Sequence, residues 1–314
     1  MKIYVGFEVR AQEAEAFRRL TAADDVWVAN PAGATAADRA AFLEAEIVFG
    51  AFPTDLLVAA TRLRWVQFSS VGIDFHRNAE WGKVAGRVVC TNLRGAFAEC
   101  MAQTVLGAIL SLNRGLDQFV RLQERRDWQK DYYHPRLHIL QGAHVLLLGN
   151  GSVTTRVREL LAQFGCTFTV YARTSGDIRS GAELDAALPK ADIVCAALPD
   201  TPETRGLMSA ERIARFKPGA LFANVGRGSL VDEAALIEVL RSGQLRGAMV
   251  DVTRNEPLPP DDPLWSCPRT LLTQHTSAGS ELEFIDAIKY FGENLARYRS
   301  GQPLQNVIDW SKGY

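Results

Sequence analysis

The sequence lacks the features that mark several classes of protein. Its five cysteines form no CxxC pair and no Cys/His ligand spacing, so we expect neither a disulfide framework nor a bound metal such as zinc. No uncharged apolar run reaches about 18 residues, which argues against a transmembrane helix. Glu8 and Arg10 interrupt the N-terminal segment, which therefore does not form the apolar core of a signal peptide. These absences predict a cytoplasmic protein with no membrane partner.

The sequence also lacks an excess of charge of either sign. Its formal net charge is −1 over 314 residues, whereas nucleic acids and anionic membranes bind strongly basic surfaces. We therefore expect no nucleic-acid partner. A small anionic substrate stays possible, because it needs only a local cation. Hydrophobic residues make up 47% of the chain, which is ordinary for a globular protein, and the length predicts two domains.

Continuous apolar runs alternate with helical patterns in the second half of the chain. The runs with the length of buried strands are His144–Leu148, Thr167–Tyr171, Asp192–Ala196, Ala220–Val225 and Ala248–Val252. This alternation predicts a parallel sheet with helices on both faces. Shorter runs of the same kind before residue 97 predict a smaller α/β unit.

Two segments between the halves differ from this rhythm. Phe97–Leu112 is strongly apolar on most faces, which predicts a helix buried in the core or at a subunit interface. Leu122–Tyr133 is polar and without clear periodicity, so we expect an irregular connection there.

A glycine-rich turn follows the first strand of the second half. His144–Leu148 runs directly into Gly149–Thr154, and a helical pattern follows. Gly149 permits a tight turn, Gly151 lets the backbone approach a phosphate, and the N–H groups of the helix start favour an anion. Thr154 stands where such loops usually have a third glycine. The motif predicts a dinucleotide site, although a simple turn in an unrelated fold is the alternative.

The end of the next strand indicates which dinucleotide is bound. An acidic residue at this position hydrogen-bonds the ribose of NAD in many such proteins. Here the strand is followed by Arg173, Thr174 and Ser175, a cation and two hydroxyl groups that suit a 2′-phosphate. We therefore expect NADP, with NAD possible if Arg173 is only a surface charge.

Three polar residues in the second half have the chemistry needed to reduce a keto acid. Arg227 lies between glycines after a strand and can bind a carboxylate through two hydrogen bonds. His275 follows an apolar segment and can exchange a proton at neutral pH. Glu256, in a proline-rich turn, can orient an imidazole and stabilise its charged form. Each taken singly is more often a plain surface residue, and spacing alone does not join them.

Taken together, these motifs resemble the D-isomer-specific 2-hydroxyacid dehydrogenases. The matching stretches in the second half are Gly149–Thr154, Leu198–Met208, Lys217–Glu233, Val250–Trp265 and Thr273–Gly279. The first half is similar over shorter stretches, Val66–Asp74 and Thr91–Gly95. The order of these stretches is far more specific than the glycine turn alone.

The resemblance implies a role for each site residue. Arg227 would bind the substrate carboxylate, His275 would transfer the proton, and Glu256 would pair with His275. The backbone at Val71 and Gly72 would also contact the substrate. The residues that the resemblance assigns to the cofactor are Gly149, Gly151, Ser152, Val153, Arg173, Thr174, Leu198, Pro199, Val225 and Asp251, the last at the nicotinamide carboxamide.

The resemblance also implies a fold of two doubly wound parallel-sheet domains, Rossmann-like or flavodoxin-like, with a cleft between them. Residues 1–97 and 284–314 would form the substrate domain, and residues 98–283 the dinucleotide domain. The apolar helix Phe97–Leu112 would contribute to a homodimer. This chain departs from the family pattern at Thr154 and at Gln274, where a proline usually precedes the histidine.

Arg173 together with Met101, Ala102 and Gln103 resembles the glyoxylate/hydroxypyruvate reductase branch of the family. This resemblance implies an enzyme that transfers a hydride between NADPH and a small 2-keto acid such as glyoxylate or hydroxypyruvate. An NAD-dependent dehydrogenase of a larger D-2-hydroxy acid is a second interpretation. A third is a binding protein that senses the dinucleotide without catalysis.

Overall fold

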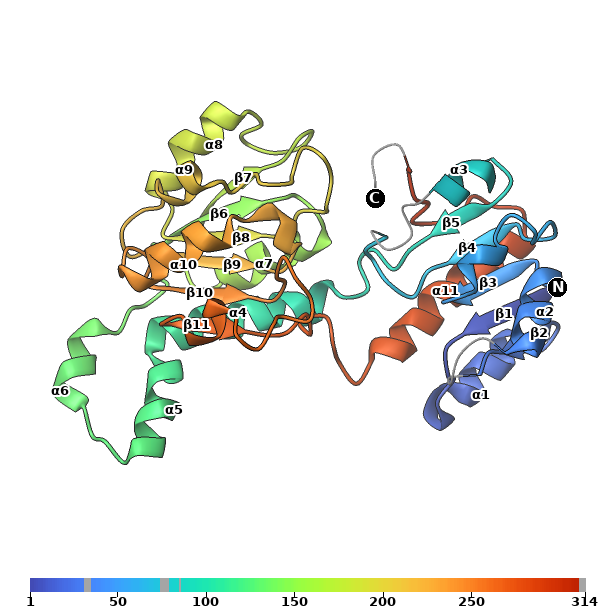
Figure 1. The fold of residues 1–314 in the computed structure, drawn as a ribbon, viewed down its shortest axis with the longest axis horizontal. Helices are drawn as coiled ribbons and strands as arrows, with labels where there is room; N and C mark the ends of the chain where they lie inside the picture. The colour runs from blue at the N-terminus through green and yellow to red at the C-terminus, as the bar shows by residue number, and fades with distance from the viewer. Residues whose placement is uncertain (31–34, 74–78, 85, 311–314) are drawn as a thin grey trace. The chain divides into compact units, whose positions relative to one another are not determined.

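The structure is a computed structural model that describes residues 1–30, 35–73, 79–84 and 86–310. The chain divides into two compact units (Figure 1). The first comprises Met1–Ala96 and Ser280–Tyr314, and the second comprises Phe97–Gly279. Within the described ranges, every helix is too short or too polar to cross a lipid bilayer.

The first unit contains a five-stranded sheet in which every pairing is parallel. The strands are β1 (Lys2–Gly6), β2 (Asp25–Val28), β3 (Ile47–Gly50), β4 (Trp65–Gln67) and β5 (Val89–Thr91). Their order, β2-β1-β3-β4-β5, is that of a doubly wound flavodoxin-like sheet. The chain reverses its direction of winding between β1 and β3.

Apolar side chains on both faces of this sheet explain why helices cover it from two sides. Tyr4, Val48 and Val66 pack in one cluster with α2 (Ala36–Glu44) and α3 (Ala79–Val84). On the other face, the Phe291 ring stacks on Phe49 and Trp65, with ring centroids 4.4 and 5.3 Å apart. The helices of that face are α1 (Ala11–Leu20) and α11 (Glu283–Arg299), so the last helix completes the first unit.

The second unit contains a six-stranded parallel sheet of order β11-β10-β9-β8-β6-β7. The strands are β6 (His144–Leu148), β7 (Thr167–Tyr171), β8 (Ile193–Ala196), β9 (Leu221–Asn224), β10 (Gly247–Val250) and β11 (Thr270–Leu272). Ile178 extends the β7 edge by a single parallel bridge to Tyr171. The order is then that of a Rossmann-like sheet, and the winding reverses between β6 and β8. The expected fold class, two doubly wound parallel sheets, is confirmed.

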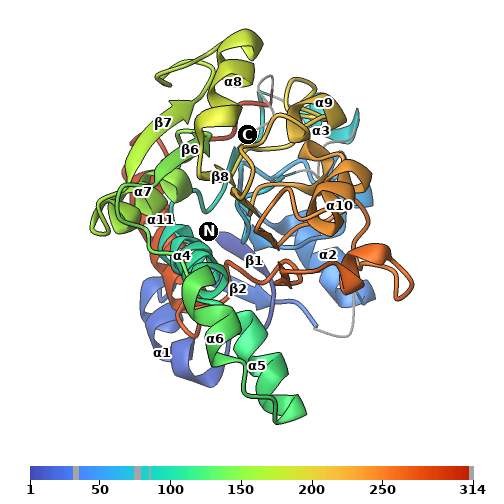
Figure 2. The ribbon, with the colours of Figure 1, turned by 90° about the vertical axis from the view of Figure 1, so that its left-hand side faces the viewer.

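Two layers of helices enclose the second sheet. On one face, α4 (Ala98–Arg114) and α7 (Ser152–Ala162) lie side by side, as both views show (Figures 1 and 2). The other face is covered by α8 (Gly181–Ala187), α9 (Ala210–Ile213) and α10 (Glu233–Arg241). Alternate strand residues point to the two faces, so Leu147 and Cys195 pack in one cluster, whereas Leu146 and Val194 pack in the other.

The structure corrects one of the two expectations about the segments between the halves. The connection predicted as irregular, Leu122–Tyr133, is largely helical: α5 (Leu116–Arg125) runs into it and α6 (Lys130–Tyr133) ends it. The polar composition of the segment agrees with the exposure of α5, which buries no residue. The apolar segment forms α4 as predicted, yet Gln103 and Gly107 are exposed on its outer face. Burial of this face at a subunit interface stays a prediction.

Candidate active site

The glycine-rich turn forms at the point where the second sheet reverses its winding. Gly149 follows β6 with φ +114°, a conformation that L side chains rarely adopt. A Cβ atom there would also lie 3.1 Å from the Ala197 carbonyl oxygen. Gly151 caps α7 without a side chain, and a Cβ atom at this position would meet nothing within 4 Å. The helix start therefore offers its N–H groups to open space, as pyrophosphate binding requires.

Thr154 replaces the usual third glycine without disturbing this turn. Its side chain is 1% exposed, and its Oγ1 donates a hydrogen bond of 3.1 Å to the Gly151 carbonyl oxygen. Val157 and Leu161, one and two turns later, pack in the cluster that joins α7 to the sheet and α4. The threonine therefore satisfies its own hydroxyl locally while the helix keeps its position on the sheet.

The loops after β6 and β7 are tied together by a side chain. The Asn150 amide donates to the Ser175 carbonyl oxygen at 2.8 Å and lies 3.0 Å from the Ser175 hydroxyl oxygen. Arg173 and Thr174, both exposed, lie in the same turn. The nearby carboxylate of Asp177 accepts the Val170 N–H at 2.8 Å and is thus engaged with the strand edge. The cation and hydroxyl predicted for the ribose end of the cofactor therefore belong to the loop that contacts the glycine turn.

The loop that carries Arg227 is clamped at the end of β9. Asn224 is buried, accepts the Gly226 N–H at 3.1 Å and donates to the Arg227 carbonyl oxygen at 3.0 Å. The half-buried guanidinium of Arg227 donates to the Gly226 carbonyl oxygen. The pKa of the Asp200 carboxyl is lowered, mainly by its hydrogen bond with Arg205 and in small part by the charge of Arg227.

Leu198 lies between the glycine turn and the Arg227 loop. A Cβ atom at Gly149 would lie 3.5 Å from the Leu198 side chain, and one at Gly226 would lie 2.6 Å from the Leu198 carbonyl oxygen. Pro199 follows it and accepts a hydrogen bond from Thr204. Val225 is buried, and its N–H bonds to the Ala196 carbonyl oxygen at 2.9 Å. These predicted cofactor residues therefore surround one end of the sheet.

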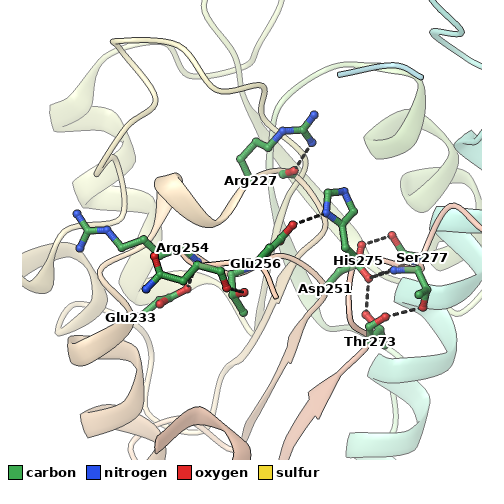
Figure 3. A network of polar contacts seen from close by, with 12 residues as sticks. Arg227, Glu233, Asp251, Arg254, Glu256, Thr273, His275 and Ser277 are labelled. Carbon is green, nitrogen blue, oxygen red and sulfur yellow. Dashed lines mark hydrogen bonds and ion pairs between the residues drawn. The ribbon is translucent and has the colours of Figure 1, made fainter. Parts of the chain in front are cut away.

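Glu256 and His275 form a direct pair although 19 residues separate them in the chain. His275 Nδ1 lies 2.7 Å from Glu256 Oε2, and Glu256 Oε1 accepts the Thr253 N–H at 2.9 Å (Figure 3). The pair is partly open to solvent, with side-chain exposures of 45% and 34%. With a proton on Nδ1, the carboxylate orients the ring, and Nε2 becomes the atom that can exchange a proton with a substrate.

Close backbone contact joins the Arg227 loop to the Glu256 loop. A Cβ atom at Gly228 would lie 2.1 Å from the backbone of Thr253, whose N–H donates to Glu256. A second carboxyl lies near this pair on α10: burial raises the pKa of Glu233, and the charges of Asp262 and Glu256 act in the same direction. The structure thus connects the three predicted catalytic residues: the backbone contact at Gly228 joins the loops of Arg227 and Glu256, and a side-chain pair joins Glu256 to His275.

Asp251 and its partners were only partly anticipated. The carboxylate is buried at the end of β10 and accepts hydrogen bonds from Thr273, Thr276 and Ser277, on both sides of His275 (Figure 3). The motifs did not predict this role, and they did not predict the clamp formed by Asn224. Both are polar residues at the end of an otherwise apolar run, which is a signal visible in the sequence.

Val71 and Gly72, the predicted substrate contacts of the first unit, lie in the loop after β4. Asn92 donates to the Val71 carbonyl oxygen at 2.9 Å, and the Ser70 hydroxyl donates to the Gly72 carbonyl oxygen at 2.8 Å. The first bond holds the loop against the segment that follows β5, and the second lies within the loop. Contact of these residues with a substrate stays a prediction.

The second unit combines a Rossmann-like sheet, a glycine turn that can bind a pyrophosphate, and Arg227, Glu256 and His275 on neighbouring loops. These features define the class of protein, which is a dinucleotide-dependent oxidoreductase. Comparison with known proteins identifies the family. Residues 106–277 match the model described as the NAD binding domain of the D-isomer specific 2-hydroxyacid dehydrogenases. The chain belongs to this family and is an enzyme of the 2-hydroxyacid dehydrogenase type.

Individual relatives agree with this assignment. The glyoxylate reductase of Aeropyrum pernix is 31% identical over 268 residues, covering 81% of this chain and 79% of that protein. A family member from Xanthobacter autotrophicus, solved in complex with NADPH and MES, superposes with a TM-score of 0.83 at 30% identity, covering 99% of this chain and all of that one. An NADPH-dependent glyoxylate/hydroxypyruvate reductase from Sinorhizobium meliloti, solved with NADP and sulfate, gives 0.82 at 25% identity, with 99% of each chain covered.

Proposed function

We propose that the protein is an NADPH-dependent reductase of glyoxylate, hydroxypyruvate or a similarly small 2-keto acid. The observation that carries the choice of cofactor is the tie between Asn150 and Ser175, because it holds the Arg173 loop against the glycine turn. The relatives from Aeropyrum and Sinorhizobium, a glyoxylate reductase and an NADPH-dependent glyoxylate/hydroxypyruvate reductase, support the choice of substrate.

The residues around the turn fit a dinucleotide with a 2′-phosphate. The open helix start at Gly151, with Ser152 and Val153 in its first turn, would bind the pyrophosphate. Arg173 and Thr174 would bind the 2′-phosphate through charge-assisted hydrogen bonds. We assign dinucleotide binding to the unit Phe97–Gly279, which also carries Arg227 and His275, and the substrate contacts of Val71 and Gly72 to the other unit.

The site residues divide the chemistry among them. A nicotinamide dinucleotide held at the glycine turn would supply the hydride for the keto carbon. Arg227 binds the substrate carboxylate and polarises the keto oxygen, and His275 Nε2 donates a proton to that oxygen as its charge develops. Glu256 keeps the imidazole oriented through its contact with Nδ1, so that Nε2 is available for the transfer. In the direction of oxidation, the neutral His275 accepts the proton instead.

The test of cofactor choice is Arg173→Asp, which replaces attraction for the 2′-phosphate by repulsion. We expect the ratio of kcat/KM with NADPH to kcat/KM with NADH to fall by about 100-fold, equivalent to roughly 3 kcal/mol. Arg158→Asp, at an exposed position on α7, is the matched control for a general change of charge and should leave the ratio unchanged. An unchanged ratio in Arg173→Asp would remove the assignment of this residue.

The test of the reaction follows nicotinamide absorbance with glyoxylate, hydroxypyruvate and pyruvate, each with NADPH and with NADH. Faster turnover of glyoxylate or hydroxypyruvate with NADPH supports the whole proposal. Turnover with NADH alone would favour the NAD-dependent alternative. Turnover of none of these, together with tight NADPH binding, would favour another keto acid or a sensing role.

We also propose that the protein is a homodimer and that α5, α6 and the segments beside them contribute to it. This part of the second unit exposes large apolar side chains: Leu116, Phe119, Val120, Trp128, Tyr132 and Ile139. Trp128 is 89% exposed, and α5 buries none of its residues. A ten-residue helix without buried contacts is marginal by itself in water, and a second copy of the chain would bury its apolar face.

Sedimentation velocity tests this assembly. We expect Val120→Lys to shift the protein from dimer to monomer, because it places a charge on the apolar face of α5. Val58→Lys, at an exposed position of the first unit, is the control and should keep the wild-type mass. A monomeric wild-type protein would overturn the proposal.

A further inference from the structure

The backbone that carries His275 has an unusual conformation. Gln274 and His275 are consecutive non-glycine residues in the left-handed region, with φ of +52° and +56°. L side chains in this region crowd their own backbone, and runs of such residues are disfavoured. A turn of this kind persists only where its surroundings hold it.

One buried carboxylate holds this turn on both sides. Asp251 is 2% exposed, and its Oδ1 accepts the Thr273 hydroxyl at 2.6 Å and the backbone N–H groups of Thr276 and Ser277 at 3.1 Å. Its Oδ2 accepts the Ser277 hydroxyl. The main-chain carbonyl oxygen of the same residue accepts the His275 N–H at 2.6 Å. Every bond in this set reaches residues 273–277 (Figure 3).

These bonds use the acceptor capacity of the carboxylate. Oδ1 accepts three donors of the turn and Oδ2 accepts a fourth, so the turn uses most of the roughly four acceptor positions of the carboxylate, and Oδ2 keeps one. A buried carboxylate is costly unless such donors satisfy it, so the charge and the turn stabilise each other.

The turn also has a fixed support on its far side. The carbonyl oxygen of Ser277 accepts the Thr104 hydroxyl of α4 at 3.3 Å. The strand β11 enters the turn on the near side, where the Thr273 N–H bonds to the Val250 carbonyl oxygen. His275 is thus anchored to β10 by Asp251 and to α4 through Ser277, and its own side chain meets Glu256 at 2.7 Å.

We propose that Asp251 is a positioning residue for His275. It holds the left-handed turn so that Nδ1 meets Glu256 and Nε2 faces the position of the substrate. This inference rests on the proposed function for its catalytic consequence, whereas its structural part is independent of the substrate.

The kinetic test uses a glycine to replace the support that Asp251 supplies. We expect Asp251→Ala to lower kcat by about 100-fold with the NADPH dissociation constant nearly unchanged. Glycine adopts positive φ without strain, so the double variant Asp251→Ala/Gln274→Gly should recover about 10-fold of that loss. Gln274→Gly alone is the control and should stay close to the wild type. A loss of NADPH affinity that glycine does not restore would show instead that Asp251 acts on the cofactor.

A milder variant covers the case in which Asp251→Ala does not fold. Thr273→Val with Ser277→Ala removes two hydroxyl donors and leaves the carboxylate in place. We expect an intermediate fall in kcat, again partly restored by Gln274→Gly. A kcat equal to that of the wild type would overturn the proposal.

Proton NMR supplies a readout that needs no turnover. A His275 Nδ1 proton bonded to Glu256 should appear far downfield, and the His275→Gln variant identifies the signal. We expect the signal to be lost in Asp251→Ala and to return in the double variant. Its persistence in Asp251→Ala would contradict the positioning role. An enzyme that turned over none of the keto acids but followed this pattern would overturn the proposed function and leave the positioning role standing.

Discussion

The two parallel sheets are wound in the same way around their first strand. After the first strand of the second sheet, however, a glycine turn leaves the N–H groups of a helix start uncovered, and the turn after β1 does not. Both first strands run into a glycine, Gly6 in the first unit and Gly149 in the second. A Cβ atom at Gly6 would lie 1.6 Å from the Ala51 carbonyl oxygen, whereas Gly151 of the second unit borders open space. The shared topology therefore does not by itself create a ligand site.

Aromatic packing explains what occupies the corresponding place in the first unit. A Cβ atom at Gly50 would lie 2.6 Å from the Phe7 ring, which also packs edge-on against Phe49 at 4.8 Å between centroids. The glycines there allow close packing of one segment against another. In the second unit Gly149 also packs closely, against the Ala197 carbonyl oxygen, and only Gly151 of the pair leaves a helix start uncovered.

Buried polar side chains differ between the units in the same manner. In the first unit, Gln67 Oε1 accepts hydrogen bonds from Thr91 and Asn294, which pins α11 to the sheet. In the second unit, Asn224 and Asp251 bond to the loops beyond their own strands. We therefore expect substitutions in the first set to change stability and substitutions in the second set to change activity.

The largest effect is expected for His275→Ala. Loss of the proton donor should lower kcat by about 1000-fold, since general acid–base catalysis contributes roughly 10²–10⁴-fold. NADPH affinity, measured by fluorescence titration, should stay near the wild-type value. His138→Ala is the control, because His138 lies on the surface away from the triad. Wild-type turnover in His275→Ala would remove this residue from the mechanism.

Asn294→Ala tests whether the buried polar residues of the first unit contribute to stability and not to activity. The variant loses a donor to Gln67 and to the Gln305 carbonyl oxygen and an acceptor for the Gln305 N–H. We expect the free energy of unfolding to fall by about 2–3 kcal/mol, measured by urea denaturation, with kcat retained below the transition. Glu293→Ala, at the exposed neighbouring position, should change neither quantity. A selective fall in kcat would break the proposed division of roles.

A smaller effect is expected for Asn224→Ala, which frees the loop of Arg227. Loss of the clamp should lower kcat/KM by about 10-fold, mainly through KM, because Arg227 binds the substrate carboxylate less firmly. Asn224→Asp keeps an acceptor for the Gly226 N–H and loses the donor to the Arg227 carbonyl oxygen. Its kcat/KM should therefore lie between those of the wild type and Asn224→Ala. An Asn224→Ala variant that lost stability but kept the wild-type kcat/KM would count against the clamp.

The smallest effects are expected for two carboxylates, each in a capping box at the start of a helix, one in each unit. The pKa of Asp38 at the start of α2 is lowered to about 2, first by the Thr35 hydroxyl and then by the Trp27 N–H. The pKa of Glu183 at the start of α8 is also lowered to about 2, first by the backbone N–H groups of Arg179 and Ser180. Each carboxylate therefore stabilises its helix above its ordinary pKa, 3.8 or 4.5, and this stabilisation is lost as the pH falls toward 2.

Urea denaturation of Asp38→Asn and Glu183→Gln at a series of pH values checks this expectation. Both variants should be less stable than the wild type at neutral pH, and the difference should shrink below about pH 4. We expect the larger difference for Asp38, because it is buried and also bonds the Trp27 indole at 2.9 Å. A difference that did not change with pH would show that the charge of the carboxylate is not involved.

The sequence by itself determined the features that depend on local pattern. Continuous apolar runs predicted the strands from β6 to β10, and the order of the motifs along the chain indicated the family. The glycine turn at Gly149 and Gly151 was visible because a short strand, a glycine pair and a helix follow one another directly. Arg227, Glu256 and His275 were selected by residue type and setting together with the family resemblance.

Only the tertiary structure decided which of these residues meet. Parallel strands bring their carboxyl ends to one edge of a sheet, but the contact between Glu256 and His275 depends on two loops with unrelated local sequences. The bond between Asn150 and Ser175 and the left-handed turn held by Asp251 arise from the same cause. Whether a glycine borders open space, as Gly151 does, or packs against a neighbouring segment, as Gly6 does, depends on what lies opposite it in the fold. Local pattern does not determine that distance, because the partners come from remote parts of the chain.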